Sequence, residues 1–215
     1  MIRNDDLQYN GLRILQDTEA ACFSEDAVLL TDFLRVKPEE RIVDLGAGNG
    51  IISILGQAKT GAAFVGVEKQ ESLCSLARQS AALNGQEIPF YCMDVLDAPT
   101  KLGRGIFSVA VMNPPYFSAG NTNINASRAL ARHVETGGLN DFLLAAFHLL
   151  KNGGKLFLCY PADRLADIVC ALRAHRLEPK HLRPALPDKH GRPQRVLIQA
   201  KKDGSPGLVW ESKEF

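Results

Sequence analysis

A glycine-rich turn between a predicted strand and a predicted helix constrains the fold of this chain more than any other feature. Residues 44–50 read D-L-G-A-G-N-G; they close the apolar strand 41–45 and precede a helix expected from 51 to about 59. Glycines let the backbone turn tightly and let a ligand approach without a Cβ in the way. The helix N-terminus offers free N–H groups to a polar or anionic ligand. The turn therefore predicts a ligand site at the end of this strand.

Apolar β-rich runs alternate with helical patterns from about residue 24 onward. This alternation favours βαβ units in a mostly parallel sheet with helices on both faces. We expect one domain over 24–203, after an N-terminal extension 1–23 and before a C-terminal tail 204–215, with a long loop at 117–138 and a turn at 151–154. Seven strands are expected at 41–45, 63–68, 90–93, 106–112 (fully buried), 155–160, 177–183 and 195–200, and helices at 24–34, 51–59, 71–84, 139–150 and 163–174.

The spacing of the glycines discriminates between cofactors. A dinucleotide site requires G-x-G-x-x-G, but here the third glycine, Gly50, comes one residue early and Ile51 takes its place. An acidic residue, Asp44, also precedes the first glycine. The pattern D-x-G-x-G-x-G resembles motif I of the S-adenosylmethionine methyltransferases, which implies that cofactor rather than a nicotinamide.

Two acidic residues follow the next strands and suit the two ends of an adenosine. Glu68 ends the second strand, where a carboxylate can accept hydrogen bonds from both ribose hydroxyls, and Asp94 follows the third, beside the backbone of Val95. A capping or surface charge is the alternative for Glu68. We place Asp94 at the adenine amino group. The candidate cofactor residues are Ser24, Asp26, Asp44, Gly46, Ala47, Gly48, Asn49, Gly50, Glu68, Lys69, Asp94, Val95 and Asn113.

The sequence N-P-P-Y at 113–116 directly follows the fourth strand. Ligands of open α/β sheets bind beyond the carboxyl ends of the strands, so this motif and the glycine turn are expected to be neighbours. The Asn113 side-chain oxygen and the Pro114 carbonyl can accept hydrogen bonds from both N–H groups of an amine and aim its lone pair at a sulfonium methyl. Tyr116 offers a face on which a base can stack. A proline turn that merely ends the strand is the alternative.

At these two motifs the chain resembles the amino-group methyltransferases that act on adenine, guanine or protein glutamine, and most of all the bacterial tRNA1(Val) adenine-N6 methyltransferase family. The resemblance covers about residues 10–205, including the pattern at 150–155 and the closing strand 195–202. It implies a Rossmann-like class I fold and methylation of the adenine 3′ of the anticodon, with Asp26 near the methionine ammonium of the cofactor or else capping its helix. The candidate RNA-contacting residues are Tyr116, Phe117, Arg132, His133 and Arg192, and the candidate catalytic residues are Asn113, Pro114 and Tyr116.

Several other functions share these motifs. Protein glutamine-N5 methyltransferases usually carry an extra N-terminal helical domain, whereas here about 23 residues precede the lead helix. Ribosomal guanine-N2 methyltransferases often have a duplicated domain, and this sequence shows no duplication. A small-molecule amine is another possible acceptor. A cofactor-binding module without catalysis is disfavoured because Asn113 and Tyr116 are both present.

Charge is unevenly spread along the chain. Residues 151–215 hold 13 Lys or Arg against 7 Asp or Glu, and the Lys and Arg residues are densest over 173–195. This is typical either of a solvated surface or of a phosphate-facing patch.

No apolar run is long enough to span a membrane and the start lacks a signal-peptide pattern, so a cytoplasmic protein is expected. The five cysteines and five histidines show no metal-binding spacing. We expect a tRNA partner and a monomer or weak homodimer.

Overall fold

The computed structural model describes residues 1–17, 25–114 and 138–211. Its centre is an eight-stranded sheet in the order β10-β8-β9-β7-β6-β3-β4-β5, parallel except where β9 pairs with β7 and β8. The strands are β3 (Arg41–Leu45), β4 (Ala63–Glu68), β5 (Phe90–Cys92), β6 (Phe107–Met112), β7 (Leu150–Pro161), β8 (Leu177–Pro187), β9 (Pro193–Lys202) and β10 (Val209–Trp210).

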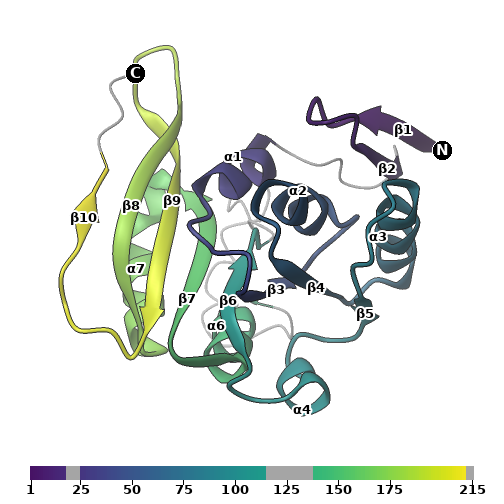
Figure 1. The fold of residues 1–215 in the computed structure, drawn as a ribbon. Coiled ribbons are helices and arrows are strands. Elements are labelled where there is room, and N and C mark those ends of the chain that lie inside the picture. The colour runs from purple at the N-terminus through teal and green to yellow at the C-terminus, as the bar shows by residue number, and fades with distance from the viewer. Residues whose placement is uncertain (18–24, 115–137, 212–215) are drawn as a thin grey trace, which may run out of the picture.

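Helices cover both faces of this sheet, as the alternation of elements predicts (Figure 1). Along β6 the side chains alternate: Val109 and Val111 join one core cluster, and Ala110 and Met112 join the other. Every residue of β6 is buried, because a parallel strand with helices on both sides meets no water. One face carries α1 (Glu25–Phe33), α2 (Ile51–Thr60) and α3 (Glu71–Leu83), and the other carries α4 (Ala98–Leu102), α6 (Leu139–Leu149) and α7 (Leu165–Ala174), which follows the short 3-10 helix η2 (Ala162–Arg164).

The sheet has one strand more than the seven expected. The extra strand, β10, comes from the segment expected to be a tail, and it adds two residues in parallel to the outer edge of β8. The residues expected to form a turn at 151–154 instead lie within β7, where the pairing with β6 is irregular and Gly153 has a φ of 72°. Neither feature has a periodic pattern that sequence reasoning can use.

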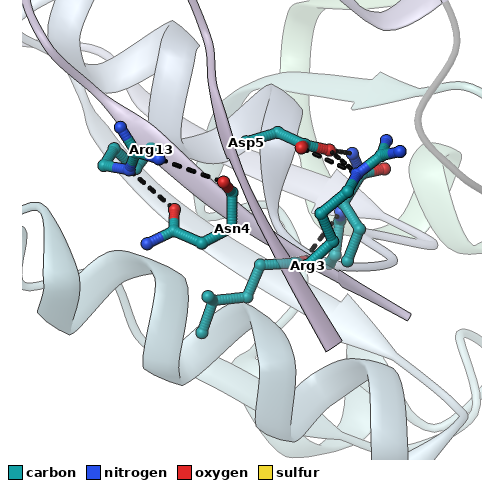
Figure 2. Close-up of polar contacts among 7 residues, drawn as sticks. Arg3, Asn4, Asp5 and Arg13 are labelled. Carbon is teal, nitrogen blue, oxygen red and sulfur yellow. Dashed lines mark hydrogen bonds and ion pairs between the residues drawn. The ribbon is translucent and has the colours of Figure 1, made fainter. Parts of the chain in front are cut away.

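The N-terminal segment forms a hairpin of β1 (Ile2–Asp6) and β2 (Arg13–Asp17), which was not predicted. Figure 2 shows its polar face, where the Arg13 guanidinium donates to the side chain and the carbonyl of Asn4, at 2.8 and 3.0 Å. Such exposed contacts add little stability. Burial of Ile14 and hydrogen bonds from the backbone of β2 hold the hairpin on the domain. The Leu15 N–H donates to the Ser80 hydroxyl of α3 at 3.0 Å, and the Arg13 N–H donates to the side-chain oxygen of Asn84, just after α3, at 2.8 Å.

A close approach inside the sheet generates a stability prediction. A Cβ on Gly66 in β4 would overlap the ring of Phe90 and lie 3.2 Å from the Cβ of Ala47. We expect Gly66→Ala to lower the free energy of unfolding by about 1–3 kcal/mol, the usual cost of overpacking a core, when measured by urea denaturation. Adding Phe90→Leu should recover part of the loss. Ala63→Ser, on the exposed end of the same strand, is the control, and a wild-type midpoint for Gly66→Ala would contradict the packing described.

Candidate active site

The glycine turn connects β3 to α2 at the carboxyl edge of the sheet. Gly46, Gly48 and Gly50 have φ values of 72°, 57° and 88°, in the left-handed region that favours glycine. A Cβ would lie 2.9 Å from the Phe142 ring at Gly46 and 2.9 Å from the Phe90 ring at Gly50, but at Gly48 it would meet nothing within 4 Å. The first and third glycines are therefore required for packing, and the open side of the turn is at Gly48.

The end of β4 holds this turn. The carbonyl of Val67 accepts hydrogen bonds from the N–H groups of Gly46 and Ala47, at 2.9 and 3.0 Å. The carboxylate of Glu68 accepts from the Gly48 N–H at 2.9 Å and from the Gln70 N–H at 2.8 Å. Each carboxylate oxygen keeps a further acceptor site. Glu68 is thus a buried carboxylate beside the open glycine, which fits a ribose that presents two hydroxyls.

Asp44 lies beneath the turn. Its carboxylate is fully buried, and one oxygen accepts from the Ser53 hydroxyl at 2.7 Å, while the other has no hydrogen-bond partner. Burial raises the pKa of Asp44 to about 7; the Ser53 hydrogen bond opposes this rise and the charge of Glu68 adds to it. In this structure Asp44 supports the turn from inside, and a direct contact with the cofactor stays a prediction. Ser53 was not identified from the sequence, where nothing distinguishes it from an ordinary helix residue.

An ion pair occupies the expected adenine end. The Lys69 ammonium lies 2.9 Å from the Asp94 carboxylate, whose other oxygen accepts from the Leu96 N–H at 3.0 Å. The hydrogen bond from Lys69 lowers the pKa of Asp94, and the same bond raises the pKa of Lys69. The side chain of Val95 is buried in the core, which leaves only its backbone for a ligand. The adenine contacts of Asp94 and Val95 stay predictions.

The N-P-P-Y motif begins where β6 ends, beside the glycine turn. β6 pairs with β3 in parallel, and Met112 lies opposite Leu45. Asn113 and Gly46, the next residue on each strand, therefore leave the sheet side by side, which confirms that the first and fourth predicted strands adjoin. Asn113 is half-buried and Pro114 is buried. Ser24, Tyr116, Phe117, Arg132 and His133 lie outside the described residues.

Two further predicted residues make contacts that the sequence did not suggest. The buried Asp26 carboxylate, at the start of α1, accepts from the Arg195 guanidinium of β9 at 3.0 Å. The Asn49 side-chain amide donates to the carbonyl of Leu15 in β2 at 3.2 Å, which ties the N-terminal hairpin to the glycine turn. Arg195 lies 169 residues from Asp26 in the sequence. Only the folded chain brings these partners together, and a cofactor contact by Asp26 or Asn49 stays a prediction.

Among residues 1–17, 25–114 and 138–211, no three His, Cys, Asp or Glu side chains gather closely enough to hold a metal ion. Within the same ranges, no helix is long and apolar enough to span a membrane.

The sheet, the glycine turn and the adjoining strand ends define a Rossmann-like S-adenosylmethionine-dependent methyltransferase. The pattern of the family described as "Methyltransferase small domain" matches residues 17–164. The chain is 31% identical over 183 residues to the tRNA1(Val) (adenine(37)-N6)-methyltransferase of Porphyromonas gingivalis, covering 81% of this chain and 72% of that protein. The protein of the same name from Dickeya chrysanthemi is 29% identical, with 94% and 81% covered. The chain therefore belongs to the methyltransferase small domain family and, within it, to the tRNA1(Val) (adenine(37)-N6)-methyltransferase family.

Solved structures agree on the fold. The Thermus thermophilus 16S rRNA N2 G1207 methyltransferase, solved with AdoMet and guanosine, superposes with a TM-score of 0.69 at 19% identity, covering 94% of this chain and 50% of that one. A predicted O-methyltransferase from Agrobacterium tumefaciens gives a TM-score of 0.69 at 23% identity, with 86% and 84% covered. At these identities the likeness concerns the fold alone.

The raised pKa of Asp44 predicts a pH dependence of stability. A carboxyl with a raised folded-state pKa stabilises the fold below its ordinary pKa of 3.8 and loses that contribution as the pH rises through about 7. We expect the melting temperature of the wild type to fall from about pH 6 to about pH 8, and to fall less in Asp44→Asn, which carries no titrating group at this site. Asp163→Asn, an exposed carboxylate, should keep the wild-type slope. Equal slopes for wild type and Asp44→Asn would show that Asp44 does not titrate in this range.

Proposed function

We propose that this chain transfers the methyl group of S-adenosylmethionine to the exocyclic N6 amine of an adenine in tRNA. By its relatives' name, the adenine is the one at position 37 of a valine tRNA. The observation that carries the proposal is the pairing of β3 with β6, which places Asn113 and Pro114 beside the glycine turn. A transfer reaction requires its two reactants in contact, and this edge of the sheet has a site for each.

The cofactor half of the site follows from the open glycine and the carboxylates beside it. Gly48 leaves room for a ligand at the turn, and Glu68, with one N–H bonded to each oxygen, has acceptor sites left for the ribose hydroxyls. Asp94 binds the adenine amino group in this proposal and releases Lys69 to do so. When bound, S-adenosylmethionine supplies an electrophilic methyl group on a sulfonium. The residues present fit this group.

The acceptor half rests on two oxygen atoms held at the end of β6. The lone pair of an adenine amine is delocalised into the ring and is a weak nucleophile. Hydrogen bonds from its two N–H groups to the Asn113 side chain and the Pro114 carbonyl favour a pyramidal nitrogen and stabilise the positive charge that develops there. The nitrogen lone pair would form the new N–C bond while the S–C bond to the sulfonium sulfur breaks, which leaves S-adenosylhomocysteine, and one N–H proton would then pass to water. Tyr116 is proposed to stack on the base, with Phe117, Arg132 and His133 beside the RNA.

The remaining parts of the proposal concern setting and assembly. A base in the anticodon loop costs less to extrude than a paired one, which suits a target that must enter the site at Asn113. We propose that the chain acts on tRNA in the cytoplasm, as a monomer or weak homodimer. The domain that does so spans 24–203, with the β1–β2 hairpin as an extension held on α3.

Methyl transfer from labelled S-adenosylmethionine to unmodified tRNA, followed by mass spectrometry of the digested nucleosides, tests the function. The proposal expects label in N6-methyladenosine, and in a valine tRNA transcript above the others. Label in N2-methylguanosine would show that the acceptor base is guanine and not adenine. Label absent from RNA in a preparation that binds the cofactor would overturn the RNA substrate and favour protein glutamine or a small amine.

Removing the Asn113 side chain separates catalysis from cofactor binding. We expect Asn113→Ala to lower kcat/KM for tRNA by about a hundredfold to a thousandfold, the usual loss when one group that stabilises transition-state charge is deleted. The Kd for S-adenosylmethionine, measured by calorimetry, should change little. Asn152→Ala, at an exposed position of β7, is the matched control. Full activity of Asn113→Ala would rule out the proposed role of its oxygen.

Neutralising Glu68 tests the cofactor half. Glu68→Gln keeps the size of the side chain but removes the charge that accepts from the ribose, and a hydrogen bond to a charged group contributes about 1.5–3 kcal/mol. We therefore expect the Kd for S-adenosylmethionine to rise about tenfold to a hundredfold by calorimetry. Glu87→Gln, exposed after α3, should bind as the wild type does. An unchanged Kd in Glu68→Gln would place the ribose elsewhere.

A further inference from the structure

The turn that joins β8 to β9 projects from the same edge of the sheet as the active site. β7 and β6 run in parallel with Leu158 opposite Met112, and Leu158 also lies opposite Ile198 of the antiparallel β9. Pro193, the first residue of β9, lies five residues from Ile198 in the direction of the carboxyl edge, or about 17 Å at the rise of an extended strand. Figure 1 shows this turn at the top of the long β8–β9 hairpin. Its residues 188–192 therefore extend past Asn113.

This turn has a defined structure of its own. The Asp188 carboxylate accepts from the N–H groups of His190 and Arg192, at 2.8 and 2.9 Å, and the Asp188 N–H donates to the Arg192 carbonyl at 2.8 Å. Gly191 supplies the left-handed residue, with a φ of 75°. The acidic side chain in the turn is thus engaged by the backbone. The side chains of Lys189, His190 and Arg192 are exposed.

The basic residues of 173–195 differ in whether their charges are paired. Four of the arginines have carboxylate partners at 2.7–3.0 Å: Arg173 with Glu178, Arg176 with Asp203, Arg183 with Glu211 and Arg195 with Asp26. Lys189 and Arg192 are the cations of the turn, and within the described residues neither side chain has an ion-pair partner. An exposed, unpaired cation is available to an external anion at no cost of breaking an internal pair.

We propose that Lys189 and Arg192 bind backbone phosphates of the RNA whose target base enters the site at Asn113. This inference rests on the proposed RNA substrate and names the surface that holds it. Lys and Arg side chains bind phosphates through charge, independently of sequence, and such contacts fix the register of a nucleic acid while other groups select the base. A turn that extends about 14 Å beyond the level of Asn113 along the strands suits phosphates a few nucleotides away from the extruded base.

Exchanging these two charges for neutral side chains tests the surface. We expect Lys189→Gln/Arg192→Gln to raise the KM and the Kd for tRNA about tenfold at low salt. The slope of log Kd against log salt concentration should fall by about 1.4–1.8, since each phosphate contact contributes about 0.7–0.9. The Kd for S-adenosylmethionine and the kcat at saturating tRNA should stay near wild type.

The matched control removes one Lys and one Arg at the opposite edge of the sheet, by Lys151→Gln/Arg173→Gln. Lys151 opens β7 and Arg173 lies near the end of α7, and both are exposed. This control should keep the wild-type salt slope. A wild-type salt slope and KM in Lys189→Gln/Arg192→Gln would overturn the inference. Equal losses of tRNA affinity in both double variants would also overturn it, because the effect would then follow net charge. A wild type that methylates no tRNA would overturn the proposed function as well, so the two failures are distinguishable.

Discussion

The hydrogen bonds between the end of β4 and the glycine turn are the contacts on which the rest of the site depends. The Val67 carbonyl accepts two turn N–H groups and the Glu68 carboxylate accepts a third. These bonds fix the left-handed path of the turn, and therefore where Gly48 opens to a ligand and where α2 begins. Since β3 lies between β4 and β6, the same arrangement sets the place of Asn113. In the proposed function, the strand pairing at this edge brings the cofactor and the acceptor nitrogen together.

Two buried carboxylates, Asp44 beneath the turn and Asp26 at the start of α1, accompany this arrangement and oppose its stability unless their charges are compensated. Asp44 has no exposed surface and only one hydrogen-bonded oxygen, and burial raises its pKa. Asp26 is balanced by Arg195, which joins α1 to β9 close to the β8–β9 turn. The carboxyl edge is thus held by polar contacts, while the two core clusters hold the faces of the sheet. Functional sites commonly depart from the most stable choice of residue in this way.

Local sequence patterns were sufficient for the central elements. β3, β4 and β6 and the helices between them have the apolar runs, periodicity and glycine stops of βαβ units, so their order and the site at their ends were predictable. The adjacency of β3 and β6 followed from the usual topology of such sheets. The family membership followed from the two motifs at 44–50 and 113–116.

Features set by tertiary contacts were not predictable. The β1–β2 hairpin is largely polar and is held by Ser80 of α3 and by Asn84, which follows that helix, some 65 to 71 residues away in the sequence. β10 has two residues and is held beside β8 by Glu211, whose carboxylate meets Arg183 at 2.8 Å. The 151–154 segment has the composition of a turn, yet strand pairing on either side draws it into β7. In each case the partner that decides the structure is distant along the chain.

A crystal structure with S-adenosylhomocysteine and an adenosine nucleotide would test the central claim directly, namely that one edge of the sheet holds both reactants. The account predicts that the ribose hydroxyls of S-adenosylhomocysteine lie within hydrogen-bonding distance of Glu68. It also predicts that the N6 amine of the adenosine nucleotide faces the Asn113 side chain and the Pro114 carbonyl. A cofactor bound away from Gly48 and Glu68, or an adenine bound away from the end of β6, would contradict it.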